Sequence, residues 1–347
     1  MDFEPLAINL AKIVIVSQVL MVGVAFMTWV ERRVCAIIQF RLGPNRVGPF
    51  GLFQPIADGI KFLLKDETLP AGSHKPLFLL APVIAFATAL CAFAVVPFGP
   101  VIEVFGRTIN LVILDLDGGM LFALAATSLG VYGIVCAGWA SRSKYALMGG
   151  LRSSAQMISY ELALGLTAVS VFLVNGTLRP TEIVAAQAGW FWNWNAFAGF
   201  QLLGFILFTV AGYAETNRLP FDLPEAESEL VAGYHTEYSS MKFSMFMMAE
   251  YIAMMTMSAL TVTLYLGGFH PGFPTGDLSG WALWALQIGA FAAKVGFFMF
   301  LFVWVRWTLP RFRYDQLMDL GWKRLFPLAL ANLVVTALLV AFDVIKG

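Results

Sequence analysis

The chain contains eight apolar segments, each long enough to cross a lipid bilayer as a helix. About 20 apolar residues are needed for one crossing. The segments lie at residues 10–30, 77–98, 119–140, 157–175, 197–214, 244–267, 281–305 and 325–343. A backbone that crosses lipid must be helical, because each unpaired amide there costs several kcal/mol. We therefore predict an all-α polytopic membrane protein with about eight transmembrane helices, in which residues 1–347 form a single membrane domain.

Basic residues are concentrated in four of the predicted loops. The loops 31–76, 141–156, 213–243 and 306–324 hold 17 of the 22 lysines and arginines. Because basic loops stay cytoplasmic, we expect these four on the cytoplasmic side and both termini on the outer, periplasmic side. The start of the chain lacks a basic region, so no cleavable signal peptide is expected.

Composition argues against several classes of function. The net charge is zero, which argues against a nucleic-acid partner on electrostatic grounds. The three cysteines are scattered without a Cys-x-x-Cys pair, and the three histidines lie outside the apolar segments. We therefore expect no disulfide framework, haem, iron–sulfur cluster or other metal site on this chain.

Residues 50–65, within the cytoplasmic loop 31–76, have the pattern of a short amphipathic helix. One helical face would carry the apolar residues Phe53, Ile56, Ile60, Leu63 and Leu64, and the other would carry Asp58, Lys61 and Lys65. Such a helix is typical of the membrane interface. It could simply rest on the lipid headgroups, or it could line an opening for a lipid-like ligand.

A cluster of carboxylates lies in the cytoplasmic loop 213–243, which we call the acidic segment over residues 215–238. It holds one arginine, Arg218, and six carboxylates: Glu215, Asp222, Glu225, Glu227, Glu229 and Glu237. Leucine, proline and aromatic residues are interleaved with them, which favours partial burial. Carboxylates held close together raise one another's pKa values and titrate as a group. The segment therefore points to proton-linked chemistry.

Four further candidates for a chemical role lie inside the apolar segments: Tyr132, Glu161, Glu250 and Lys294. Glu161 and Glu250 are close enough to a span end to reach the surface, but Lys294 lies near the middle of its span. An unpaired ammonium there would cost ~3 kcal/mol or more. We therefore expect Lys294 to face the interior, either with a carboxylate partner or as a neutral amine. Ionisable groups within membranes are usually functional.

Several longer motifs carry a family resemblance. They are Glu31-Arg32-Arg33, Arg41-Leu-Gly-Pro-Asn-Arg46-Val-Gly-Pro, Gly138-Trp-Ala-Ser141, Gln156-Met-Ile-Ser-Tyr-Glu161, the acidic segment and Pro310-Arg-Phe-Arg-Tyr-Asp-Gln316. Together they resemble the H subunit of the proton-pumping NADH:quinone oxidoreductase, respiratory complex I. The equivalent subunit in eukaryotes is the mitochondrially encoded subunit 1. The resemblance runs from the first apolar segment to the last.

The resemblance implies a site and a set of partners. The quinone tunnel would be lined or supported by Arg32, Arg41, Phe53 and Asp58. The acidic proton path would comprise Glu161, Glu215, Asp222, Glu225, Glu227, Glu229 and Glu250. Tyr132, Arg152, Arg218 and Lys294 would be charge partners or relay groups. Quinone, expected to be ubiquinone, would be the substrate, while FMN and the iron–sulfur clusters would belong to partner subunits.

Other interpretations remain open from the sequence. We expect a bacterial inner membrane, with the mitochondrial inner membrane as the alternative. The chain could instead be the related membrane subunit of an energy-converting hydrogenase, which uses no quinone. It could also be a proton-coupled secondary transporter, or an anchor that binds quinone without moving protons.

Overall fold

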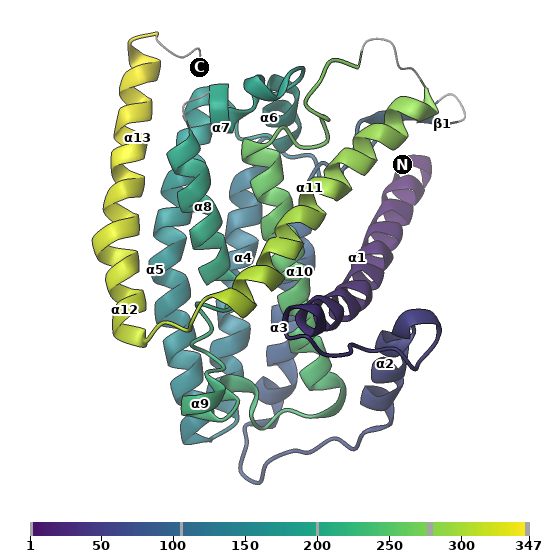
Figure 1. Cartoon of the computed structure of the whole chain (residues 1–347), viewed down its shortest axis with the longest axis vertical. Coiled ribbons are helices and arrows are strands. Elements are labelled where there is room, and N and C mark those ends of the chain that lie inside the picture. The colour runs from purple at the N-terminus through teal and green to yellow at the C-terminus, as the bar shows by residue number, and fades with distance from the viewer. Residues whose placement is uncertain (1–2, 105–106, 199–200, 276–279, 344–347) are drawn as a thin grey trace.

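Long apolar helices make up most of the fold (Figure 1). The computed structural model describes residues 3–104, 107–198, 201–275 and 280–343, and of residues 3–7, 104, 107, 227 and 228 it describes the backbone alone. Within these ranges, seven helical stretches are long and apolar enough to cross a membrane. They are α1 (Phe3–Ile38), α3 (Lys75–Phe93), α4 (Gly119–Ala140), α5 (Lys144–Asn175), α10 (Ser240–Tyr265), α11 (Trp281–Thr308) and the stretch Tyr314–Ala341. The helical, multi-pass class predicted from the sequence is confirmed.

The eighth predicted span is shorter than expected. Segment 197–214 corresponds to a four-residue helix α7 (Asn195–Ala198) followed by α8 (Leu202–Glu215). The 14 residues of α8 extend about 21 Å, less than the ~30 Å of hydrocarbon in a typical bilayer. Helix α8 lies between α5 and α10 and ends at Glu215 (Figure 1). The number of crossings and the side that the termini face remain predictions.

Several helices continue beyond their apolar cores. Helix α1 runs to Ile38 and α5 begins at Lys144, so both include residues that were expected in loops. Neither extension contains a proline that would end the helix, and a helix can continue among lipid headgroups, where water is available to its polar side chains. The last stretch comprises α12 (Tyr314–Asp319), a π-helical turn η4 (Leu320–Leu325) and α13 (Phe326–Ala341).

A small β-hairpin is an exception to the all-α prediction. Strands β1 (Val101–Val104) and β2 (Arg107–Asn110) pair antiparallel, with Ile102 opposite Ile109. Four residues per strand give too short an alternation of polar and apolar side chains to be recognised reliably. Near the same end of the molecule lie α6 (Pro180–Ala186) and the 3-10 turn η2 (Phe191–Asn193).

The expected amphipathic helix is present as α2 (Gln54–Leu64), preceded by the 3-10 turn η1 (Pro49–Gly51). None of the α2 residues is buried, and its apolar face, which includes Ile56, Ile60 and Leu63, is exposed. Helix α2 lies beside the lower part of α1, outside the main bundle (Figure 1). An exposed apolar face on an isolated helix is typical of a helix at the membrane interface.

The acidic segment packs closely against α5. It contains the short helix α9 (Glu227–Leu230) and the 3-10 turn η3 (Gly233–His235). A Cβ atom on Gly149 of α5 would lie 2.7 Å from the carbonyl oxygen of Pro224 and 2.8 Å from the amide nitrogen of Tyr234. Gly233 has a positive φ of 57°, and a Cβ there would lie 1.6 Å from the same carbonyl. Glycine at these two positions therefore allows the segment to fold tightly against the bundle.

Candidate functional site

A buried network of ion pairs joins the acidic segment to three long helices. Arg218 of the segment donates a hydrogen bond from Nη1 to Glu31 Oε1 of α1 at 3.1 Å. Its Nε lies against Glu250 Oε1 of α10. Arg306 of α11 also donates to Glu31. Because α1, α10 and α11 pack against one another here, the network connects all three.

An aromatic residue completes the surroundings of Arg218. The hydroxyl of Tyr251 donates to Glu31 Oε2 at 2.5 Å, and the Arg218 guanidinium lies over the Tyr251 ring, 4.6 Å from its centre. A second pair, Arg311 Nη2 to Asp222 Oδ2 at 2.9 Å, ties the segment to the loop after α11. Buried charges that are paired and hydrogen-bonded in this way hold their geometry, because breaking one partner leaves another uncompensated.

A cavity of about 300 Å³ opens beside this network. Its polar walls come from residues of both signs: Glu31, Arg32, Arg41, Arg218, Asp222, Glu225, Glu250 and Arg306. Apolar and aromatic side chains, including Cys35, Met247, Tyr251 and Trp307, form the rest of the wall. The volume is at the lower end of the range for small-molecule sites. We call it the larger cavity.

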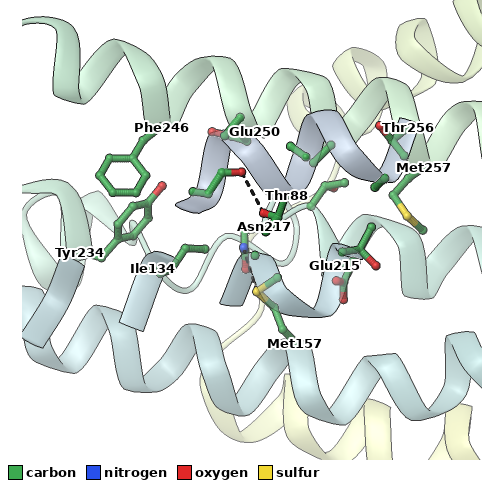
Figure 2. Close-up of a pocket in the computed structure, with 18 of the residues that line it drawn as sticks. Thr88, Ile134, Met157, Glu215, Asn217, Tyr234, Phe246, Glu250, Thr256 and Met257 are labelled. Carbon is green, nitrogen blue, oxygen red and sulfur yellow. Dashed lines mark hydrogen bonds between the residues drawn. The ribbon is translucent and has the colours of Figure 1, made fainter. Parts of the chain in front are cut away.

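A smaller cavity of about 80 Å³ lies on the other side of the acidic segment, among α3, α4, α5 and α10 (Figure 2). Most of its lining is apolar, with Ile134, Phe246 and Met257 among the residues drawn. Glu215 contributes a buried carboxylate, neither oxygen of which has a hydrogen-bond partner among the described residues. A buried polar group without a partner costs free energy, so it calls for an explanation such as a catalytic role or a bound water molecule. The volume is sufficient for a few water molecules.

The two cavities share a wall. Asn217, Glu225 and Glu250 line both of them. Asn217 is held in place by Gln156 of α5, whose Nε2 donates to Asn217 Oδ1 at 3.2 Å. A change of charge in the larger cavity therefore acts on carboxylates that also border the smaller one.

The groups of the acidic segment have shifted pKa values with separate causes. Burial alone would lower the pKa of Arg218, but Glu250 and Glu31 more than offset it, and the pKa lies well above its ordinary value. Burial raises the pKa of Asp222, and Arg311 limits that rise. For Glu225, burial is reinforced by the neighbouring carboxylates Glu250 and Asp222, so its pKa is raised well above the usual range. Arg218 thus stays charged, whereas Glu225 can hold a proton.

Three more residues of the expected acidic path lie away from the shared wall. Glu161 accepts a hydrogen bond from Ser128 Oγ between α5 and α4 and lines neither cavity. Glu229, whose side chain is 44% exposed, pairs with Arg152 at 2.6 Å on the surface. The side chain of Glu227 lies outside the described part of the structure.

Two expected relay groups are not brought to the cluster. Tyr132 of α4 is 62% exposed, with its side chain on the outer face of the bundle. Lys294 of α11 faces inward, as expected, but its Nζ donates to three backbone carbonyls, those of Leu266 at 2.6 Å, Gly268 at 3.1 Å and His270 at 2.6 Å. Of the two alternatives expected for Lys294, the described residues provide no carboxylate partner, and the neutral amine remains a prediction. A strongly tilted α11 brings the middle of the helix to the turn that follows α10 (Figure 1).

The residues expected at the quinone tunnel divide into two groups. Arg32 and Arg41 line the larger cavity. Asp58 of α2 pairs with Arg32 at 2.6 Å and so supports its position. Phe53 is exposed at the start of α2 and lines neither cavity.

Reasoning from the sequence missed several members of the network: Glu31, Tyr251, Arg306 and Arg311. Glu31 and Arg306 were assigned to loops because the apolar windows ended before them. The available signal was their helical phase. Glu31 lies four residues after Met27, and both are buried, so Glu31 shares the inward face of α1. Among the described residues, no group of three or more His, Cys, Asp or Glu could hold a metal ion.

Comparison with known proteins identifies the family. Residues 11–337 match the family model for NADH dehydrogenase. The chain is 51% identical to the H 2 subunit of NADH-quinone oxidoreductase from Koribacter versatilis, an alignment that covers 97% of this chain and 98% of the relative. It is 51% identical to the H 1 subunit from Geobacter sulfurreducens, over 96% and 95% of the two chains, and 47% identical to the H 1 subunit from Cytophaga hutchinsonii, over 96% and 97%. The chain therefore belongs to the NADH dehydrogenase family, the family of these H subunits of NADH-quinone oxidoreductase.

Proposed function

We propose that this chain is the membrane subunit of a bacterial NADH:quinone oxidoreductase that admits quinone and converts its reduction into proton movement. The larger cavity receives the quinone ring, and the smaller cavity begins the proton path. The observation that carries this proposal is the wall of Asn217, Glu225 and Glu250, which borders both cavities. Partner subunits of the complex, in the same inner membrane and in a peripheral arm, would hold FMN and the iron–sulfur clusters.

The larger cavity has the chemistry that quinone reduction needs. Reduction of a quinone to a quinol takes up two electrons and two protons, so the site must bind polar carbonyl oxygens and tolerate transient negative charge. Arg32, Arg41 and Arg306 supply positive charge in the wall, and Tyr251 and Trp307 supply aromatic surface for the ring. The fixed pair of Arg218 and Glu31 keeps this wall in place.

Glu225 is the group best placed to respond to the reaction. Its pKa is raised by burial and by neighbouring carboxylates, so a change in the charge nearby shifts the balance between its protonated and ionised forms. A swing of about 3 pKa units corresponds to ~4 kcal/mol, and moving one charge against 100 mV costs ~2.3 kcal/mol. One such swing can therefore drive a proton against somewhat under 200 mV. Glu250 and Glu215 then continue the path into the smaller cavity.

The test compares Glu215→Gln with Glu229→Gln in membrane vesicles that contain the assembled complex. Glutamine keeps the shape of the side chain and removes its ability to ionise. We expect Glu215→Gln to lose proton pumping by tenfold or more, with quinone reduction reduced much less. Glu229→Gln changes an exposed carboxylate of the same segment that lines neither cavity, and we expect both activities to be retained.

Other outcomes would redirect the proposal. Pumping retained in Glu215→Gln would favour a chain that anchors the complex and binds quinone without moving protons. Equal loss of pumping in both variants would mean that the acidic segment acts through its total charge rather than through the shared wall.

A further inference from the structure

The position of α2 depends on attachments at a few points, because the helix has no buried residue of its own. Near its start, Trp29 Nε1 donates to the carbonyl of Phe50 at 3.1 Å. In its middle, Asp58 pairs with Arg32. An element held by few contacts is free to shift unless those contacts are maintained. The strongest set of contacts is at its far end.

There, Ser239 and the first residues of α10 contact the end of α2 and the residues that follow it. Ser240 Oγ donates to the carbonyl of Phe62 at 2.9 Å. Ser239 Oγ accepts from the amide of Thr68 at 3.1 Å and lies 3.0 Å from the Thr68 hydroxyl. Lys242 Nζ lies 2.9 Å from Glu67 Oε2. We call these contacts between residues 62–68 and 239–242 the clasp.

Lys242 is an unusual residue for its position. A lysine one turn into a membrane helix can extend to the water interface, yet this side chain is only 9% exposed, whereas that of Glu67 is 52% exposed. Its ammonium also lies 5.7 Å from the centre of the Phe78 ring. The side chain of Lys242 thus points inward, and the carboxylate of Glu67, from the segment that follows α2, lies against it. A charge held in this way fixes the distance between the two segments.

The clasp lies on the same helix as the wall of the larger cavity. Met247, Glu250 and Tyr251 of α10 line that cavity, and they follow Lys242 by about one and a half to two and a half turns. On the other side, Asp58 of α2 supports Arg32, which also lines it. Helix α2 is therefore attached to two helices that contribute to the cavity wall: to α1 through Arg32, and to the start of α10 through the clasp.

We propose that Ser239, Ser240 and Lys242 are positioning residues that set the distance between α2 and α10, and thereby the mouth through which the apolar tail of a quinone lies. The inference rests on the proposed function of the larger cavity. The exposed apolar residues of α2, among them Ile56, Ile60 and Leu63, then face the tail and the lipid. The clasp stays closed during turnover, because none of its contacts involves the reacting ring.

The test measures quinone reduction by the complete complex in its membranes with a long-tailed and a short-tailed quinone. For Lys242→Met and for Glu67→Gln, we expect the KM for the long-tailed quinone to rise about fivefold, equivalent to ~1 kcal/mol, with kcat little changed. The KM for the short-tailed quinone should change less than twofold. The charge exchange Lys242→Glu with Glu67→Lys should recover most of the long-tail effect. If Lys242→Met does not assemble, Ser239→Ala takes its place with the same expectation.

Two reference variants make the result decisive. Lys323→Met removes another lysine–carboxylate pair, Lys323 Nζ to Asp319 Oδ1 at 2.8 Å, and should leave both KM values unchanged. Met247→Trp fills the larger cavity and should impair both quinones. Clasp variants that change neither KM while Met247→Trp impairs reduction would overturn the clasp proposal and leave the proposed function intact. If Met247→Trp is also without effect, the assignment of quinone to this cavity fails.

A cross-link checks that the clasp is static. The cysteine pair Thr68→Cys with Ser239→Cys replaces two hydroxyls that lie 3.0 Å apart. We expect the oxidised pair to retain the kcat of the reduced pair. Loss of activity on oxidation, restored by a reductant, would show that the clasp must open and would overturn the static role.

Discussion

Helix α10 lies beside buried charge at two places, but the charge is neutralised in different ways. Near the middle of the helix, Glu250 lies against Arg218, close to other carboxylates, and borders both cavities. Past the last turn, the Lys294 ammonium is held by three backbone carbonyls and lies 4.2 Å from the centre of the Trp194 ring. Lys294 lines neither cavity.

The difference concerns which partners can change their charge. Backbone carbonyls do not titrate, so the three hydrogen-bond acceptors of Lys294 keep the same charge whatever happens elsewhere. Carboxylates do titrate, and those around Arg218 are close enough to interact electrostatically, so the protonation of one changes the pKa of the next. We therefore predict that Lys294 has a structural role, whereas the charges around Arg218 are adjustable.

The largest expected effect comes from removing the central cation. Arg218→Gln leaves Glu31 and Glu250 buried without their common partner, and removing one member of such a network costs about 3–5 kcal/mol. We expect the variant to form little assembled complex. Quinone reduction, measured per milligram of membrane, should fall at least tenfold. Arg179→Gln is the matched control, because Arg179 pairs with Asp115 at 2.9 Å in a more exposed position. Equal losses in both variants would contradict the special role of the Arg218 network.

A moderate effect is expected at Lys294, which lies past the last turn of α10. Lys294→Met removes the donor of three hydrogen bonds and leaves carbonyls unpaired, at about 1–3 kcal/mol for a buried polar group. We expect the complex to dissociate at a lower temperature, while the ratio of protons pumped to quinone reduced stays constant. Lys294→Arg should recover part of the stability. A lower ratio of protons pumped to quinone reduced in Lys294→Met would contradict a purely structural role and would support a place for Lys294 in the proton path.

The smallest expected effect is a dependence on pH at His235. Burial lowers the pKa of His235 from 6.5 to about 4. Between these values the unfolded chain binds a proton that the folded chain does not, so the free energy of unfolding falls as the pH falls, by at most ~1.4 kcal/mol per pH unit. His235→Gln should therefore lose less thermal stability than the wild type between pH 7 and pH 5.

A second titratable group lies beside His235, so the result is the difference between the pH profiles of the wild type and the variant. Glu225 Oε1 lies 3.7 Å from His235 Nδ1, and its raised pKa makes stability fall as the pH rises, in the opposite direction. Comparing wild type and variant removes the contribution of Glu225 that both share. His74→Gln, at an exposed histidine, controls for the loss of an imidazole. Identical pH profiles for His235→Gln and the wild type would contradict the buried, neutral state of His235.

The hydropathy pattern predicted the architecture, and the motifs indicated the family. The apolar windows located α3, α4, α10 and α11 because a bilayer demands a minimum apolar length. The α2 prediction succeeded because amphipathic periodicity is a local property of a few turns. Windows do not register where a helix continues in headgroups, so the extensions of α1 and α5 were missed.

The composition of the acidic segment also indicated its chemistry, but its members could not be separated by sequence alone. Glu225 and Glu229 are four residues apart, yet one borders both cavities and the other pairs with Arg152 on the surface. The acidic segment folds closely against Gly149 of α5, and this fold places Glu225 and Glu229 in different surroundings. No periodic pattern encodes it, because the segment is irregular.

The sequence by itself therefore determined that the chain is a helical membrane protein, which family it belongs to and where its unusual charges lie. The tertiary structure decided which charges meet. Glu31 and Arg218 are 187 residues apart in sequence and 3.1 Å apart in space, and Lys294 finds carbonyls rather than a carboxylate because α11 is tilted. Hydropathy is a sum over neighbours along the chain, whereas an ion pair depends on the angle and register at which distant helices pack.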